Sequence, residues 1–292
     1  MVRVLLSLIW AALLFGCGKS SVPLPDDAHP ALWEIRTDNG KPVGWLFGTV
    51  HALPDGLEWR FPALEKVIEQ ADTLVVEVST LEDGASISAQ FAKMGGDEPP
   101  SLSAIQRIEP ALRAEFQKVL NESSLDQSDL DSMESWAAAL TLAAVSQTGD
   151  TDNGVDRALL RRFDGRPIIE LEGAAAQLQI FDSLPESEQI DLLNAVLKEA
   201  KHATTTTERM TEAWRLGDLE TLEQITARGM LADPELRKAL LTNRNRLWAA
   251  VVGDAIGSGD RPLVAVGAGH MLGPEGLPVL LAEAGYTVVR VP

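Results

Sequence analysis

Two of the four histidines have matching local surroundings, although they lie far apart in the chain. His51 ends the run Val43-Gly-Trp-Leu-Phe-Gly-Thr-Val-His51, and His270 ends the run Leu263-Val-Ala-Val-Gly-Ala-Gly-His270. Each run is apolar and strand-like, finishes in Gly-x-x-His, and leads through a turn into an amphipathic helix. Ligands and catalytic groups collect at the carboxyl ends of strands in α/β folds. We therefore expect both imidazoles to meet in one site and to share a metal ion.

Glu77 completes this candidate metal site. It interrupts the apolar run Leu74-Val-Val-Glu-Val at the end of a strand that should lie beside the strand of His51. A carboxylate in an apolar strand is costly unless it is paired or bound to a metal. His51, His270 and Glu77 match the two-imidazole, one-carboxylate ligand set of catalytic zinc or similar divalent ions. The alternative is that the histidines are hydrogen-bonded structural groups and Glu77 is a strand-end acid that reaches solvent.

Four further polar residues form a less specific set: Asp156, Glu172, Arg244 and Asn245. They could serve as a second acid, a general base, or an anchor for a substrate carboxylate or oxyanion. Charged residues on helices more often face solvent, which is the alternative for each. Other catalytic templates are missing, because the chain has no Gly-x-Ser-x-Gly elbow, Walker loop or His-Glu-x-x-His helix.

Each histidine belongs to a strand–turn–helix–strand unit. The first unit is predicted as strand Val43–Phe47, a helix from Pro62 and strand Thr73–Val78. The second is predicted as strand Leu263–Val266, a helix around Leu277–Ala284 and strand Tyr286–Val291. The two units indicate an internal duplication, or a common unit that arose twice independently.

The fold class predicted from this order is α/β, with the two units forming a central sheet and a large, mostly helical insertion or cap between them. The α/β core is assigned to residues 31–80 and 258–292, and the helical region to about 100–257, with a short strand near 167–171. Helices are expected at Ala111–Leu120, Leu130–Ser146, Val155–Phe163, from Pro185 to about Lys201, Glu208–Leu216, around Leu219–Ala227 and Pro234–Ile256.

The first 30 residues read as an export signal and a tether. Arg3 precedes an apolar run that is too short to span a bilayer, and Cys17 directly follows the small residue Gly16. We interpret residues 1–16 as a lipoprotein signal peptide, Cys17 as the lipidated residue, and 17–30 as a flexible tether ahead of a domain at 31–292. The chain would then face the periplasm from a bacterial envelope membrane. Ordinary secretory cleavage near Gly16, or a buried lone thiol, is the alternative.

The charge of the chain limits its partners. The net charge is −18, and cleavage after residue 16 would leave 24 basic against 43 acidic residues. A surface this acidic repels phosphate backbones, so nucleic acid is not expected as a partner.

These motifs together resemble the TraB/GumN family over nearly all of the region after the tether. The matching segments are Leu46–His51, Glu77, Gly154–Asp156, Leu171-Glu172, Arg244-Asn245, Val266–Leu277 and Gly285-Tyr-Thr-Val. One departure is Gly173, where the family more often has a threonine, which puts a role for a hydroxyl there in doubt. The family includes the Tiki metalloproteases and is related to a superfamily with erythromycin esterase-like enzymes and haem-binding ChaN-like lipoproteins.

The resemblance implies a peptidase that depends on a divalent metal, with manganese or cobalt as plausible ions and zinc suggested by the ligand set. The expected substrate is a peptide or protein. His51, His270 and Glu77 would hold the ion, Glu77 would also act in catalysis, Arg244 would orient substrate or stabilise the oxyanion, and Glu172 would accept a proton. The alternatives are a non-catalytic lipoprotein that binds haem or metal, and a structural envelope protein whose site has decayed. A homodimer is the candidate assembly of this chain.

Overall fold

The computed structural model describes residues 28–292, except residues 82, 97–99 and 202. The predicted signal peptide at 1–16, Cys17 and most of the tether at 17–30 lie outside the described residues. Among the residues that are described, no helix combines the length and the apolar character needed to cross a membrane.

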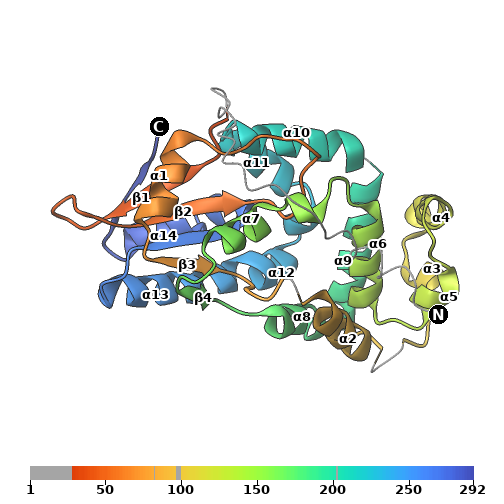
Figure 1. The fold of residues 1–292 in the computed structure, drawn as a ribbon. Coiled ribbons are helices and arrows are strands. Elements are labelled where there is room, and N and C mark those ends of the chain that lie inside the picture. Colours follow the sequence, from red (N-terminus) through yellow and green to blue (C-terminus); the bar gives the residue numbers. More distant parts are fainter. Residues whose placement is uncertain (1–27, 82, 97–99, 202) are drawn as a thin grey trace.

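A six-stranded sheet in the order β4-β3-β5-β2-β1-β6 organises the molecule (Figure 1). Its strands are β1 (Leu32–Arg36), β2 (Pro42–Thr49), β3 (Thr73–Val76), β4 (Ile168–Glu170), β5 (Pro262–Gly267) and β6 (Thr287–Arg290). β5 is parallel to both β2 and β3, and β3 is parallel to β4, whereas β1 is antiparallel to its neighbours β2 and β6. The fold is therefore mixed α/β, as the sequence predicted.

The described helices are α1 (Pro62–Gln70), α2 (Gly84–Met94), α3 (Ala104–Arg107), α4 (Arg113–Glu122), α5 (Gln127–Asp131), α6 (Ser135–Ser146), α7 (Val155–Arg162), α8 (Ala174–Asp182), α9 (Glu186–Ala200), α10 (Ala203–Arg215), α11 (Leu219–Thr226), α12 (Pro234–Arg237), α13 (Asn243–Gly257) and α14 (Leu277–Glu283). A π-helical turn at Lys238–Thr242 joins α12 to α13, and a 3-10 turn at Ala268–Met271 follows β5.

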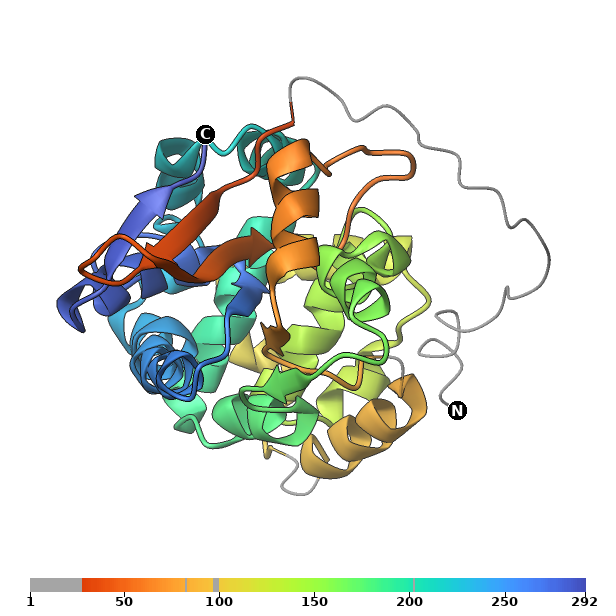
Figure 2. The same ribbon diagram turned by 60° about the vertical axis from the view of Figure 1, so that its left-hand side comes forward.

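The middle strands are buried because helices cover both faces of the sheet. The run Pro-Leu-Val-Ala-Val of β5 is wholly buried, which explains why it is continuously apolar instead of alternating. On one face, side chains of the sheet pack against α1, α7, α10 and α11, and on the other against α13 and α14. Figure 2 shows α1 crossing the sheet on its near side.

A second body of helices builds its own apolar core away from the sheet. Residues of α3, α4, α5, α6, α8 and α9 form one cluster, in which Trp136, Phe116 and Leu192 are fully buried. In Figure 1 this body lies on the side of the molecule opposite the hairpin between β1 and β2. The region between the two strand units thus has two roles, because α7 and α13 cover the sheet while α4, α6 and α9 stand beyond it.

Several elements differ from the sequence-based expectation. β1, α2 and α8 were not predicted, and the expected helix Leu130–Ser146 begins only at Ser135. The expected continuous helix Pro234–Ile256 is interrupted by the π-helical turn. The predicted short strand near 167–171 is confirmed as β4, and it pairs with β3 at one edge of the sheet.

Candidate active site

The candidate site lies at the carboxyl edge of the three parallel strands β2, β3 and β5. Thr49 at the end of β2 is in register with Gly267 at the end of β5, and Val76 at the end of β3 is in register with Ala265. His51, Glu77 and His270 each follow one of these strand ends within three residues. The parallel register therefore delivers all three predicted ligands to one edge.

Gly267 marks the point on which these three side chains converge. A methyl group on its α-carbon would lie 3.3 Å from Oε1 of Glu77, 3.7 Å from Nε2 of His51 and 3.8 Å from Cδ2 of His270. The N–H of Gly267 donates a 2.7 Å hydrogen bond to Oε1 of Glu77, and Nε2 of His270 lies 3.9 Å from the same oxygen. The glycine of the second Gly-x-x-His motif thus leaves space that any side chain would fill.

Asp156 orients the ring of His51. Nδ1 of His51 donates to Oδ2 of Asp156 at 2.7 Å, while the hydroxyl of Thr49 donates to the other carboxylate oxygen. Asp156 is buried, whereas the His51 side chain is 64% exposed. The buried carboxylate therefore holds an imidazole ring that is itself open to solvent. The charge of Asp156, with that of Glu77, raises the pKa of His51 to about 9 despite the opposing effect of desolvation. Without a bound cation, His51 is therefore protonated at neutral pH.

Asn245 gives His270 a different environment. Oδ1 of Asn245 lies 2.5 Å from Nδ1 of His270, and Nδ2 of Asn245 donates to the carbonyl of Glu275 at 2.7 Å, which fixes the amide orientation. Because the amide oxygen only accepts, Nδ1 of His270 carries the proton and Nε2 keeps a free lone pair. Burial lowers the pKa of His270 to about 3, and its ring centroid lies 4.3 Å from that of Trp248. His270 is thus a neutral imidazole, the form that binds metals.

Arg244 joins the two glutamates that the sequence singled out. Its Nη2 donates to Oε2 of Glu77 at 2.8 Å, and its Nε and Nη2 donate to the two oxygens of Glu172 at 2.7 and 2.8 Å. Nη1 donates to the carbonyl of Leu240 inside the π-helical turn. Burial opposes the ionisation of Glu77, but the positive charges of protonated His51 and Arg244 and the N–H of Gly267 favour its charged form, and its pKa lies below the ordinary value.

Gln177 is a site residue that the sequence reasoning missed. Its Nε2 donates to Oε2 of Glu77 at 3.1 Å from the first turn of α8, a helix that was not predicted. An isolated glutamine carries no motif, so only a correct prediction of α8 and its contact with β3 would have pointed to it. Asp156 and Asn245 belonged to the less specific set, and the structure places both against the histidine rings.

The donor set fits a divalent cation in its chemistry. Each histidine uses Nδ1 for a carboxylate or amide partner, which is the usual outer support of metal-binding histidines. Nε2 of His51 then lies beside the space at Gly267, and Nε2 of His270 lies 3.9 Å from Oε1 of Glu77. The donor atoms of the three residues do not all lie within 4.8 Å of one another. Among the described residues, that spacing is met by the group Glu188, Asp233 and Glu235, of which only Glu235 is fully exposed.

Fold and site together define a mixed α/β protein with a His-Glu-His cluster at the carboxyl edge of its parallel strands. The sequence profile of the TraB/PrgY/gumN family matches residues 31–290, and the chain belongs to that family. It is 26% identical over 242 residues to the uncharacterized protein YbaP of Escherichia coli (strain K12), covering 81% of this chain and 86% of YbaP. The YbaP protein of Shigella flexneri gives the same values. No solved structure matches the chain.

Proposed function

We propose that the protein is a hydrolase that depends on a divalent metal and that its substrates are peptides or proteins. The observation that carries this proposal is the convergence of His51, Glu77 and His270 on the space beside Gly267. These three residues would hold manganese, cobalt or zinc. When bound, such an ion supplies a Lewis acid that polarises a carbonyl and lowers the pKa of water.

The chain's own residues prepare this chemistry. Asp156 and Asn245 fix both imidazoles with Nε2 toward the site, and Oε1 of Glu77 faces the same space for proton transfer. Arg244 carries the positive charge that would orient the substrate or stabilise an oxyanion. Both oxygens of Glu172 are engaged by Arg244, so its predicted role as proton acceptor requires that this pair opens; while it is closed, Glu172 holds Arg244 in place.

We further propose that the protein works in a bacterial envelope, anchored through a lipid on Cys17 and facing the periplasm, as the N-terminal sequence suggests. The tether would leave the exposed ring of His51 accessible to extended substrates in that compartment. A homodimer is compatible with this arrangement, and its existence is tested by measuring the mass of the purified protein in solution.

The proposed function is tested by elemental analysis of the purified protein together with digestion of a peptide library with and without added manganese. We expect bound metal and metal-stimulated cleavage in the wild type, and the loss of both in His51→Ala and His270→Ala. If both variants fold, keep their metal and keep activity, the proposal is wrong. A visible absorption band on adding haem, without peptide cleavage, would instead favour the non-catalytic carrier.

A further inference from the structure

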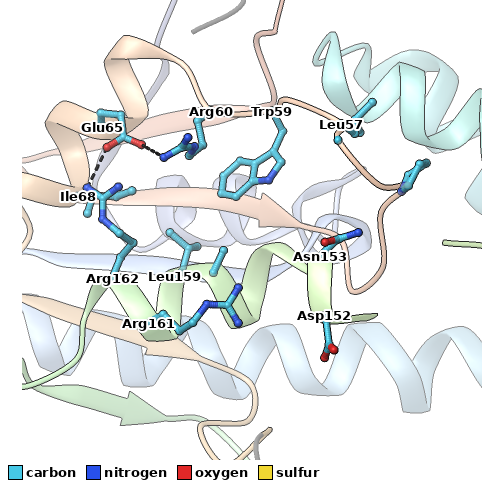
Figure 3. A pocket seen from close by; sticks show the side chains of 13 residues that line it. Leu57, Trp59, Arg60, Glu65, Ile68, Asp152, Asn153, Leu159, Arg161 and Arg162 are labelled. Atoms are coloured by element: carbon cyan, nitrogen blue, oxygen red, sulfur yellow. Dashed lines mark ion pairs between the residues drawn. The ribbon is translucent and has the colours of Figure 1, made fainter. Parts of the chain in front are cut away.

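A separate hollow of about 350 Å³ lies between the segment that follows His51 and helix α7 (Figure 3). The apolar part of its wall consists of Leu57, Trp59, Ile68, Ala158 and Leu159. Its volume falls at the lower end of the range for small-molecule sites. Nothing in the catalytic proposal uses this hollow, and none of the candidate ligands lines it.

The charged part of the wall is unusual for a chain with a net charge of −18. Arg60, Arg161 and Arg162 line the hollow together with only two acids, Glu65 and Asp152. Glu65 is already engaged, because Arg162 contacts one of its oxygens at 2.9 Å and Arg60 lies 3.9 Å from the other. The wall therefore keeps a surplus of one positive charge in an acidic protein.

Arg161 provides this surplus charge. Its guanidinium has no hydrogen bond or ion pair with any of the described residues, and in Figure 3 it extends from α7 toward the side where Asn153 lies. A guanidinium without a partner presents a fork of N–H donors that matches a carboxylate. Asp152 also lines the hollow and offsets one of the three arginines, so the net charge of the wall matches a ligand with one negative charge.

The aromatic wall indicates what the rest of the ligand is. Trp59 is nearly buried and is held by Phe47 and Trp214, whose ring centroids lie 6.3 and 6.2 Å from its own. Its position is thus set by the core and not by a ligand, so it is a rigid surface on which an apolar group can pack. Asn153, which closes the hollow on another side, is fixed by hydrogen bonds to the carbonyl of Leu53 and to Asp55.

We propose that this hollow binds a small organic monoanion, namely a single carboxylate on an apolar or aromatic body, with the carboxylate on Arg161 and the body against Trp59. The hollow is separate from the proposed metal centre, because within the described part of the chain neither Arg161 nor Trp59 makes a hydrogen bond, ion pair or ring contact with His51, Glu77 or His270.

The test is calorimetric titration of the purified protein with 4-phenylbutyrate and with its neutral amide. We expect saturable binding of the acid and binding at least about tenfold weaker for the amide, because a charge-assisted hydrogen bond is lost. Arg161→Gln should weaken binding of the acid about tenfold. Arg113→Gln, which removes an exposed arginine in the distant helical body, is the matched control and should change nothing. Ala158→Leu, which reduces the hollow, should also prevent binding.

The proposal would be overturned by no saturable binding of the acid, by equal binding of acid and amide, or by unchanged binding in a folded Arg161→Gln variant. Inorganic phosphate that competes as well as 4-phenylbutyrate would also overturn it, since the apolar wall would then contribute nothing. The same titration on His270→Ala separates this proposal from the proposed function, because binding in the hollow should persist when the metal centre is removed.

Discussion

At the scale of single residues, Gly267 is the most sensitive test of the candidate metal centre. Its backbone has a φ of −47° and a ψ of 136°, which alanine adopts without strain, so Gly267→Ala should fold. The added methyl would stand among the three predicted ligands at 3.3 to 3.8 Å. We expect manganese affinity to fall at least about tenfold, as it does when the support of a metal ligand is disturbed.

Competition with a metal-binding dye measures that loss. Gly253→Ala is the matched control, because a methyl at this helical glycine of α13 meets nothing within 4 Å. It should leave metal binding unchanged. Equal affinity in the Gly267→Ala and Gly253→Ala proteins would contradict the placement of the ion beside Gly267.

The pKa of His51 gives a second test at this scale. In the metal-free protein the ring should titrate at about 9, because Asp156 and Glu77 favour its charged form. Asp156→Asn removes the largest cause, so the pKa should fall toward the ordinary value of 6.5. NMR titration of the imidazole signals measures both values. Asp152→Asn, an exposed acid ahead of the same helix, is the control and should leave the His51 signal unmoved.

The sign of the effect on stability follows from the same pKa. Since folding raises the pKa of His51, its contribution to stability is complete below the unfolded value of 6.5 and is lost as the pH rises toward 9. Asp156→Asn should therefore reduce the difference in stability between pH 6 and pH 10 that the wild type shows. A wild-type ring that titrates near 6.5 would refute this account of the Asp156 pair.

At the scale of elements, the two ion pairs that Arg244 forms with Glu77 and Glu172 connect α13 to the ends of β3 and β4. All three side chains are about one-tenth exposed, so removing the guanidinium leaves two nearly buried carboxylates without the positive charge that both of them share. Arg244→Met should lower the free energy of unfolding by about 3 kcal/mol at neutral pH. Denaturant unfolding measures this loss of stability. Arg246→Met on the same helix is the control and should not reproduce the loss.

The pH dependence of this loss identifies its cause. The pKa of Glu77 is depressed in the folded protein, so its contribution is present above the unfolded pKa and is lost as the pH falls through the folded value. Arg244→Met should therefore cost less at acidic pH than at neutral pH. If Arg244→Met lowers the free energy of unfolding equally at acidic and neutral pH, or if Arg246→Met lowers it as much, packing of the helix and not the ion pairs is responsible.

The elements also show what sequence patterns can and cannot predict. The buried parallel strands β2, β3 and β5 were predicted because a strand covered on both faces is continuously apolar, and their register then brings His51, Glu77 and His270 together. β1 mixes Trp33 and Ile35 with charged residues at the edge of the parallel strands, and its short pattern carries little signal.

The contacts around the histidines were harder to predict than the histidines themselves. Asp156 and Gln177 lie on helices whose packing against the sheet decides their partners, and no local spacing relates them to His51 or Glu77. The π-helical turn before Arg244 has no sequence signature, yet it breaks the regular helix that the apolar periodicity predicted. Sequence thus located the strand-end residues of the candidate site, while tertiary packing determined how their side chains are oriented.

At the scale of the whole molecule, the net charge of −18 attracts any divalent cation, so stabilisation by manganese has two possible sources. Screening of the charge acts over the entire surface and is shared by magnesium at equal ionic strength. Binding at the proposed site beside Gly267 would require the histidines and would stabilise the fold by mass action, by about 2.7 kcal/mol at a concentration 100 times the Kd.

Thermal unfolding separates these sources and gives the last prediction. Manganese should raise the Tm of the wild type by several degrees more than magnesium does, and His270→Ala should abolish that excess while keeping the shared effect of screening. The acidic group of Glu188, Asp233 and Glu235 is a competing location, because its oxygens lie within 4.8 Å of one another. Glu188→Gln should leave the manganese excess intact. If Glu188→Gln removes the excess and His270→Ala does not, the cation binds the acidic group and the His-Glu-His cluster is not the metal centre.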